Sequence, residues 1–264
     1  MFNITESTIR LLLFGGGILF FFFLELLAPY RLSSVSKVKR WINNLALALF
    51  NSIVINLIFS AAIAGTATYV QIHKLGILNM IPAPIWLKIL FTVAFMDFIL
   101  YIWHLLNHKM PFFWRFHRVH HSDLNMDVSS ATRFHIGELA ISAVIKISVI
   151  FFLGADLLGV IIFESAVVLC AQFHHSCLKI PRWFENIFWI FFVPPSMHRI
   201  HHSVVIKERD SNYGTIFSFW DRIMETLITR VDQAGIRIGV GAYPKAEKLD
   251  FHQLLIMPFT RPIR

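Results

Sequence analysis

The sequence predicts an all-α integral membrane protein, a helical bundle of about four to five transmembrane helices with a histidine-rich cap on the cytoplasmic side. Two features of the composition indicate this: only 15% of the 264 residues are charged, and the mean hydropathy is +0.62. An ordinary soluble domain has about 25% charged residues to cover its surface. No linker rich in Pro, Gly or Ser divides the chain, so we expect one membrane domain over residues 1–264. Within it we expect N-terminal spans (1–84), a core (85–230) and a C-terminal tail (231–264).

Five apolar segments are candidate membrane spans, because a helix needs about 20 apolar residues to cross the hydrocarbon core. The first has almost no basic residues before it and no small-residue cleavage site after it, so we interpret it as a retained span. The last two are short and joined by a tight turn, so they form either a full or a shallower hairpin. Residues 183–193 are aromatic but too few to span, which favours an interfacial helix. The five spans are residues 9–28, 42–64, 85–103, 136–153 and 157–173.

The basic residues orient the chain, since cytoplasmic loops carry an excess of Lys and Arg. These residues follow the first, third and fifth spans, whereas the loops after the second and fourth contain only Lys74. The N-terminus is therefore expected outside and the C-terminus in the cytoplasm. The same charge distribution explains the net charge of +8 by basic loops and anionic lipid, without a nucleic-acid partner.

Histidines are clustered in three motifs, all on the predicted cytoplasmic side. His104 and His108 are four residues apart and share a helix face. The strings His117–Ser122 and His198–Ser203 both place histidines at positions one, four and five, and they differ only by Val119 and Ile200. Eight imidazoles beside an apolar bundle are costly to bury without partners, and a shared metal centre is the simplest partner.

Several kinds of metal site are disfavoured by the residues present. Structural zinc sites use four ligands, often cysteine, whereas this chain has only Cys170 and Cys177. The HExxH motif of metalloproteases and the ExxH pairs of soluble di-iron bundles are absent. A haem needs only one or two axial ligands. Eight or nine imidazoles are enough for two metals, but imidazole binds iron, zinc, copper and nickel alike.

At these motifs the chain, from about residue 85 to its end, resembles the fatty acid hydroxylase / sterol desaturase superfamily of membrane di-iron enzymes, in particular its short bacterial members. Ser130–Glu138 is similar to the family's R-F-H-P-x-E segment, and His175–Pro181 to its H-x-N-x-x-x-P segment. Asn212–Gly214 and Trp220–Arg222 match its N-Y-G and W-D-R elements. The chain departs from the pattern at Ile136, where the family has Pro, and at Cys177, where it often has Asn.

The resemblance implies two iron ions, with O2 as co-substrate and no catalytic residue beyond the metal ligands. The implied ligands are the eight motif histidines and a ninth, namely His104, His108, His117, His120, His121, His175, His198, His201 and His202. Further side chains are candidates for ligands or for orienting the imidazoles: His135, His174, Asp97, Glu138, Asn212, Asp221, Asp123, Asp127 and Asp210. Asp97 lies two helical turns before His104 and so shares its face.

The implied activity is hydroxylation or desaturation of a C–H bond in a lipid such as a fatty acyl chain or sterol, with ether cleavage also open. No nucleotide-binding fingerprint is present, so electrons come from an external reductase, ferredoxin or cytochrome. Arg199, Lys207 and Arg209 either dock an acidic reductase or ferredoxin or are simply the basic residues of a cytoplasmic loop. The implied location is a bacterial inner membrane. The alternatives are a non-catalytic metal-binding or metal-carrier protein and an inactive relative; the scarcity of polar residues along the spans counts against a carrier.

Overall fold

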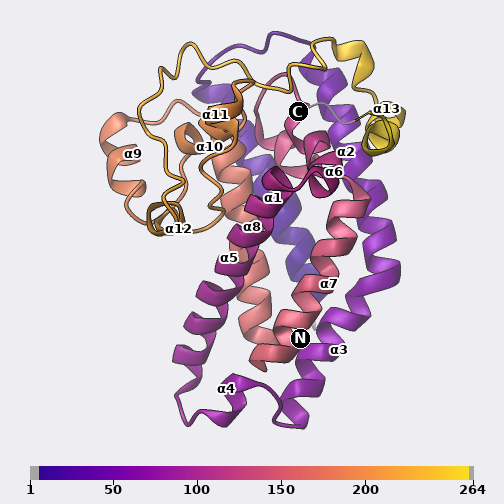
Figure 1. Ribbon diagram of the computed structural model, residues 1–264, viewed down its shortest axis with the longest axis vertical. Helices are drawn as coiled ribbons and strands as arrows, with labels where there is room; N and C mark the ends of the chain where they lie inside the picture. Colours follow the sequence, from indigo (N-terminus) through magenta and orange to yellow (C-terminus); the bar gives the residue numbers. More distant parts are fainter. Residues whose placement is uncertain (1–5, 262–264) are drawn as a thin grey trace.

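Five long helices form the body of the molecule in the computed structural model, which describes residues 6–261 (Figure 1). All five are long and apolar enough to cross a membrane, and between 17% and 28% of each apolar stretch is buried inside the protein. Most of their apolar side chains therefore face outward, as lipid contact requires. No β-strand occurs among residues 6–261, so the prediction of an all-α multi-pass membrane protein is confirmed. The five are α1 (Glu6–Leu27), α2 (Lys37–Ile55), α5 (Ile85–Lys109), α7 (Ile136–Leu153) and α8 (Leu157–His175).

Four of these helices extend beyond the predicted spans, α1 by only three residues at its start. Helix α2 begins at Lys37 rather than at residue 42, and it continues through a π-helical turn, η1 (Asn56–Ser60), into α3 (Ala61–Ile72). Helices α5 and α8 continue past residues 103 and 173 and carry histidines in their last turns. Hydropathy detects only the part of a helix that faces lipid, so polar helical turns beyond the membrane were missed.

The turn between α7 and α8 packs against α4 (Ile77–Met80), at the end of the bundle away from the histidines (Figure 1). Gly154 ends α7 with a φ of 68°, and a Cβ at this position would lie 2.1 Å from the carbonyl oxygen of Leu75. Only glycine fits this close approach and this conformation. Both helices of the hairpin are 18 or 19 residues long, which is sufficient for a full crossing.

Short helices and loops cover the opposite end of the bundle (Figure 1). Arg118 holds the C-terminal segment there, since its guanidinium donates to the carbonyl oxygens of Met257, Thr260 and Arg261. Helix α9 exposes Trp183 and Ile187, as expected of an interfacial helix, although it ends at Phe188. The elements of this cap are α6 (Pro111–His121), η2 (Val128–Thr132), α9 (Arg182–Phe188), α10 (Pro195–His201), α11 (Ile206–Arg209), α12 (Phe219–Ile223), η3 (Ala246–Lys248), α13 (Phe251–Ile256) and η4 (Met257–Phe259).

Candidate metal centre

The nine predicted ligands come from four helices whose ends meet where the bundle joins the cap. Helix α5 brings two of them, α6 three, α8 one and α10 two, and the ninth, His202, directly follows α10 as its C-cap. Helices α6 and α10 both have proline in the first turn, at Pro111 and Pro195, where the missing N–H costs nothing and the fixed φ favours helix initiation. All nine side chains are buried, with at most 8% of each residue exposed.

The histidines form two separate groups, and within each group the ligand nitrogens lie within 4.8 Å of one another. Each HxxHH motif contributes to both groups. In the first motif, His117 and His121 belong to one group and His120 to the other. In the second motif the division is reversed, because His201 belongs to the group of His117, and its two histidine neighbours belong to the group of His120. The first group is His104, His108, His117, His121 and His201, and the second is His120, His175, His198 and His202.

In the first group, several imidazole rings bond a protein oxygen through Nδ1 and leave Nε2 without a partner. His104 Nδ1 lies 2.7 Å from the carbonyl oxygen of Tyr213, and His201 Nδ1 lies 2.7 Å from that of Ser211. These oxygens can only accept, so each Nδ1 carries the proton and each Nε2 presents a lone pair. The Nε2 atoms of His104, His108 and His201 are buried and have no partner within the protein. Unpaired buried acceptors of this kind fit a metal ion.

In the second group, three imidazole nitrogens converge on one another. The Nε2 of His198 lies 3.0 Å from the Nε2 of His175 and 3.0 Å from that of His202. A neutral imidazole either donates or accepts at a given nitrogen, so one nitrogen cannot satisfy two such neighbours well. His120 joins them through its Nε2 side, because its Nδ1 lies 3.2 Å from the carbonyl oxygen of Arg133. A cation among these nitrogens would satisfy all four rings.

The electrostatics of the site favour the neutral imidazole, which is the form that binds metal. Burial is the main cause of the lowered pKa values in the cap portion of the site, and the neighbouring histidines lower them further. The pKa lies well below its ordinary value for His120, His121, His198, His201 and His202. These rings therefore remain neutral at physiological pH, and the donor set fits two metal ions.

Glu138, at the start of α7, contacts one of the candidate ligands directly. Its Oε1 lies 2.8 Å from His117 Nδ1, an arrangement that fixes the ring's tautomer and orientation. Asp210 Oδ1 lies 3.4 Å from His108 Nδ1, which makes it a longer partner of the same kind. Both carboxylates were among the side chains that the sequence predicted as candidates for orienting the imidazoles.

Asp97, Asn212 and Asp221 act on the loop that follows α11, without contacting an imidazole. Asp97 accepts from the backbone N–H groups of residues 216 and 217 and from Trp220 Nε1 at 2.9 Å. Asp221 accepts from the backbone of Tyr213 at 2.7 Å, and Asn212 bonds the carbonyl oxygens of residues 197 and 228. Together these contacts hold the segment whose Tyr213 carbonyl orients His104.

His135 and His174 lie outside both histidine groups. His135 caps α7, because its Nδ1 accepts from the backbone N–H of Gly137 at 2.9 Å, and its Nε2 lies 3.1 Å from the carbonyl oxygen of Leu255. Both of its ring nitrogens are thus occupied. The His174 ring lies 4.0 Å from that of His198, centroid to centroid, and its buried Nδ1 has no partner within the protein. His174 is therefore a neighbour of the second group.

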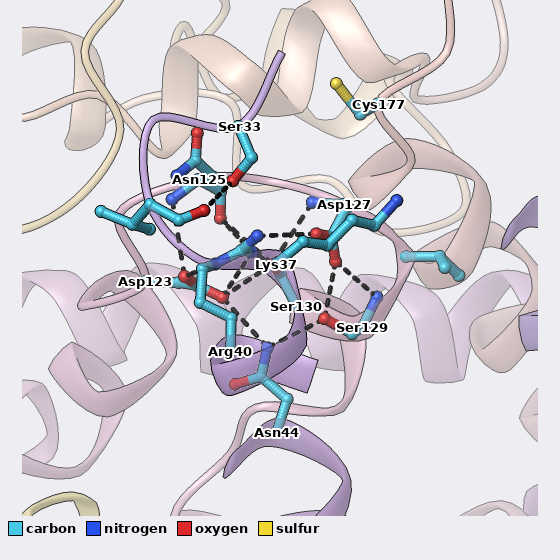
Figure 2. A network of polar contacts seen from close by, with 12 residues as sticks. Ser33, Lys37, Arg40, Asn44, Asp123, Asn125, Asp127, Ser129, Ser130 and Cys177 are labelled. Carbon is cyan, nitrogen blue, oxygen red and sulfur yellow. Dashed lines mark hydrogen bonds and ion pairs between the residues drawn. The ribbon is translucent and has the colours of Figure 1, made fainter. Parts of the chain in front are cut away.

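A buried ionic network beneath the cap was missed by sequence reasoning (Figure 2). Arg40 contacts Asp123 at 2.5 Å and Asp127 at 2.7 Å, and Asn44 donates to Asp123 at 3.1 Å. Burial alone would raise the pKa of Asp123, but the charges of Arg40 and Arg133 hold it well below the ordinary value. The basic residues after the first span were predicted to lie in a cytoplasmic loop, and hydropathy gives no signal that one of them, Arg40 in the first turn of α2, faces inward.

This network reaches the histidines through Arg133. The Arg133 guanidinium donates to the carbonyl oxygen of Val119 at 3.0 Å and to Ser122 Oγ at 2.9 Å, at the end of α6. Its own carbonyl oxygen is the partner of His120 Nδ1. The loop of residues 122–133 thereby holds the end of α6, and with it the ring of His120.

Two of the three residues suggested for docking an electron donor are buried. Arg199 stacks on Tyr30, with 3.9 Å between the guanidinium carbon and the ring centroid, and Arg209 stacks on Trp114 at 4.3 Å. Only 3% of Arg199 and 6% of Arg209 is exposed, whereas Lys207 is exposed. The suggestion is therefore wrong for Arg199 and Arg209, because loop arginines can be drawn inward by aromatic rings.

Comparisons with known proteins place this site in a family. The chain is 28% identical over 179 residues to an ornithine lipid hydroxylase of Rhizobium tropici, covering 67% of this chain and 52% of that protein. It is 30% identical over 137 residues to an alkylglycerol monooxygenase of Caenorhabditis elegans, covering 52% of this chain and 26% of that protein. A cholesterol 25-hydroxylase of Homo sapiens is 28% identical over 144 residues, covering 53% of this chain and 51% of that protein.

The matches thus span about half the length of these relatives or less. No solved structure matches the chain. The family model for fatty acid hydroxylase matches residues 89–226, which is more than half of the chain and includes both histidine groups. The chain belongs to the fatty acid hydroxylase family.

Proposed function

We propose that the nine histidines bind two iron ions and that the protein uses O2 to hydroxylate a C–H bond of a membrane lipid. The observation that carries the proposal is the pair of buried histidine groups at one end of an apolar five-helix bundle. The relatives named above as hydroxylases or monooxygenases of ornithine lipid, alkylglycerol and cholesterol support a lipid substrate.

The iron ions would be held by five imidazoles in the first group and four in the second. When bound, they supply the activation of O2 that cleaves an unactivated C–H bond. In the overall reaction the C–H bond becomes C–OH, and the second oxygen atom leaves as water. Two electrons and two protons are required, and we propose that an external reductase, ferredoxin or cytochrome supplies the electrons.

The protein's own residues contribute orientation and exclusion of water. Glu138 and the carbonyl oxygens of Tyr213 and Ser211 fix the imidazole rings so that their Nε2 atoms face the metal position. Trp114 covers His108 and His121, with ring centroids 5.2 and 5.5 Å away. A dry, preoriented site protects reactive chemistry from side reactions with water.

We propose that the histidine groups lie on the cytoplasmic side, in a bacterial inner membrane, with the N-terminus outside. The distribution of Lys and Arg among the loops supports this orientation. Reporter fusions at residue 30 and at residue 76 would test it, since a reporter active only outside the cytoplasm should respond at residue 76 alone.

The proposal is tested by elemental analysis of the detergent-purified protein together with lipid analysis of expressing cells grown under ¹⁸O2. We expect about two irons per chain, and oxygenated lipids that carry the label. The double variant His120→Ala, His201→Ala removes one ligand from each group. It should lose both the bound iron and the labelled lipids. His252→Ala is the matched control, since His252 lies exposed on α13 outside both groups.

Zinc without iron after anaerobic expression with added iron, and no labelled lipid, would contradict the proposal. Iron content and labelled product that persist in the double variant would also contradict it.

A further inference from the structure

A groove between α5 and α7 opens on the surface of the bundle, within the membrane-spanning segments. It encloses about 40 Å³, and Phe163 of α8 lies at its base. Its walls are mostly apolar, and its half-buried residues face the hydrocarbon region, where lipid chains are the available occupants. The wall from α5 includes Met96, Leu100 and Trp103, and the wall from α7 includes Ser142, Ile145 and Val149.

On α5, the face that lines the groove continues to Asn107. Met96, Leu100, Trp103 and Asn107 are spaced four, three and four residues apart, which places them on one side of the helix. Asn107 lies between the candidate ligands at positions 104 and 108. Only 1% of it is exposed, and neither its Nδ2 nor its Oδ1 has a hydrogen-bond partner. A buried amide with no partner in the protein is free to bind the polar group of a ligand.

On α7, the corresponding face continues to Glu138. Val149, Ile145, Ser142 and Glu138 have the same spacing in the reverse order. The Oε1 of Glu138 is engaged by His117, but its Oε2 is buried without a partner. The face of each helix therefore runs eleven residues, or roughly 16 Å, from the apolar end of the groove to a polar group beyond it, beside the first histidine group.

The charged groups beside the groove, deeper in the bundle, are already paired. Lys146, which also borders the groove, contacts Glu164 at 2.5 Å, and Glu164 contacts Arg10 at 2.5 Å. This region therefore offers no unpaired charge to a lipid headgroup. The buried polar atoms without a partner on these two helix faces, those of Asn107 and Glu138 Oε2, are at the histidine end.

We propose that this groove holds one alkyl chain of a membrane lipid, with the lipid's polar end at Asn107 and Glu138. The chain then points away from the histidines, and the carbon that is oxidised lies close to the polar group rather than at the methyl end. The Asn107 amide donates to a carbonyl or hydroxyl oxygen, and Glu138 Oε2 accepts from a hydroxyl or amide N–H. A lipid in the leaflet nearer the histidine groups has the same orientation, with its polar end toward them and its alkyl chain pointing away. The proposal rests on the proposed function for the oxidation itself.

The occupant is tested by photocrosslinking in membranes, a measurement that needs no bound metal. Expressing cells are fed a fatty acid that carries a diazirine near either its carboxyl or its methyl end, and they incorporate it into their lipids. We expect carboxyl-end adducts on the peptide that contains Trp103 and Asn107, and methyl-end adducts near Met96 and Val149. Ser142→Trp should abolish these adducts, whereas Val144→Trp, on the exposed side of α7, should retain them. Adducts in reversed order, or adducts unaffected by Ser142→Trp, would overturn the proposal.

The role of Asn107 is tested by Asn107→Leu, which keeps the size but removes the amide. We expect unchanged metal content and a loss of crosslinking of about tenfold, as for one lost hydrogen bond, with partial recovery in Asn107→Gln. Unchanged crosslinking in Asn107→Leu would contradict the assignment.

The position of oxygen in the labelled lipid separates this inference from the proposed function. Oxygen within a few carbons of the polar group supports both. Oxygen near the methyl end overturns the inference and leaves the function standing. Crosslinking as expected in a protein that forms no oxygenated lipid retains the groove assignment and overturns the function.

Discussion

The Oε1 atom of Glu138 lies 2.8 Å from His117 Nδ1, so the first turn of α7 orients a ring that α6 contributes to the first histidine group. Both side chains are buried, with 4% of Glu138 and 2% of His117 exposed. A carboxylate in this position fixes the Nδ1–H tautomer and increases the basicity of Nε2. This contact couples the geometry of the membrane helices to that of the candidate metal centre.

Replacing Glu138 should weaken metal binding without removing a ligand. We expect Glu138→Ala to lower the affinity about 10- to 100-fold, as for other partners of metal-bound histidine. Glu138→Gln retains an acceptor oxygen and should have a smaller effect. Competition with a chelator of known affinity measures both, and equal affinity in wild type and both variants would show that the contact is not used.

The two histidine groups should lose metal independently. His104→Ala removes a ligand of the first group only, and His175→Ala one of the second group only. We expect each variant to retain about one metal per chain, because the other group keeps all of its imidazoles. Elemental analysis after dialysis against a weak chelator gives the number of metal ions per chain. Full metal content in both variants would argue against two separate sites.

Removing Arg40 should destabilise the protein strongly. Arg40→Met leaves Asp123 and Asp127 buried without their cation, and breaking a buried pair in this way costs about 3–5 kcal/mol. Lys39→Met is the matched control, because the neighbouring Lys39 is exposed. Thermal unfolding in detergent compares the two. A similar unfolding midpoint for both variants would mean that the network in Figure 2 contributes little.

The stability should depend on pH through Asp221. Burial raises the pKa of Asp221 to about 6, so the folded state holds this proton more tightly than the unfolded state does. The free energy of unfolding contributed by this group therefore falls as pH rises from about 4 to about 6 and is constant above that. The Asp221→Asn variant lacks this titrating group, so its free energy of unfolding does not fall in this way. The difference in the free energy of unfolding between wild type and the variant should therefore become smaller over the same pH range.

Unfolding midpoints in detergent between about pH 4 and pH 8, measured for wild type and Asp221→Asn, give this difference. Parallel pH profiles would show that another group is responsible.

Much of the fold was predictable because it depends on local sequence. The span over residues 136–153 was predicted with the bounds that α7 has, since apolar length is a property of one segment. The boundaries of α2, α5 and α8 were less accurate, because polar turns continue these helices beyond the lipid. Spacing predicted the eight motif histidines and the family resemblance added His175, whereas neither predicted their division into two groups.

The sequence by itself determined that five helices face lipid and that histidines four residues apart share a helix face, because hydropathy and the 3.6-residue helical period act locally. Only the tertiary structure decided that His120 and His121 belong to different groups, that Arg40 is buried, and that Asn107 lacks a partner. These properties depend on contacts between segments that are far apart in the chain, such as the 83 residues between Arg40 and Asp123. The packing of several helices fixes those contacts, and no single segment encodes them.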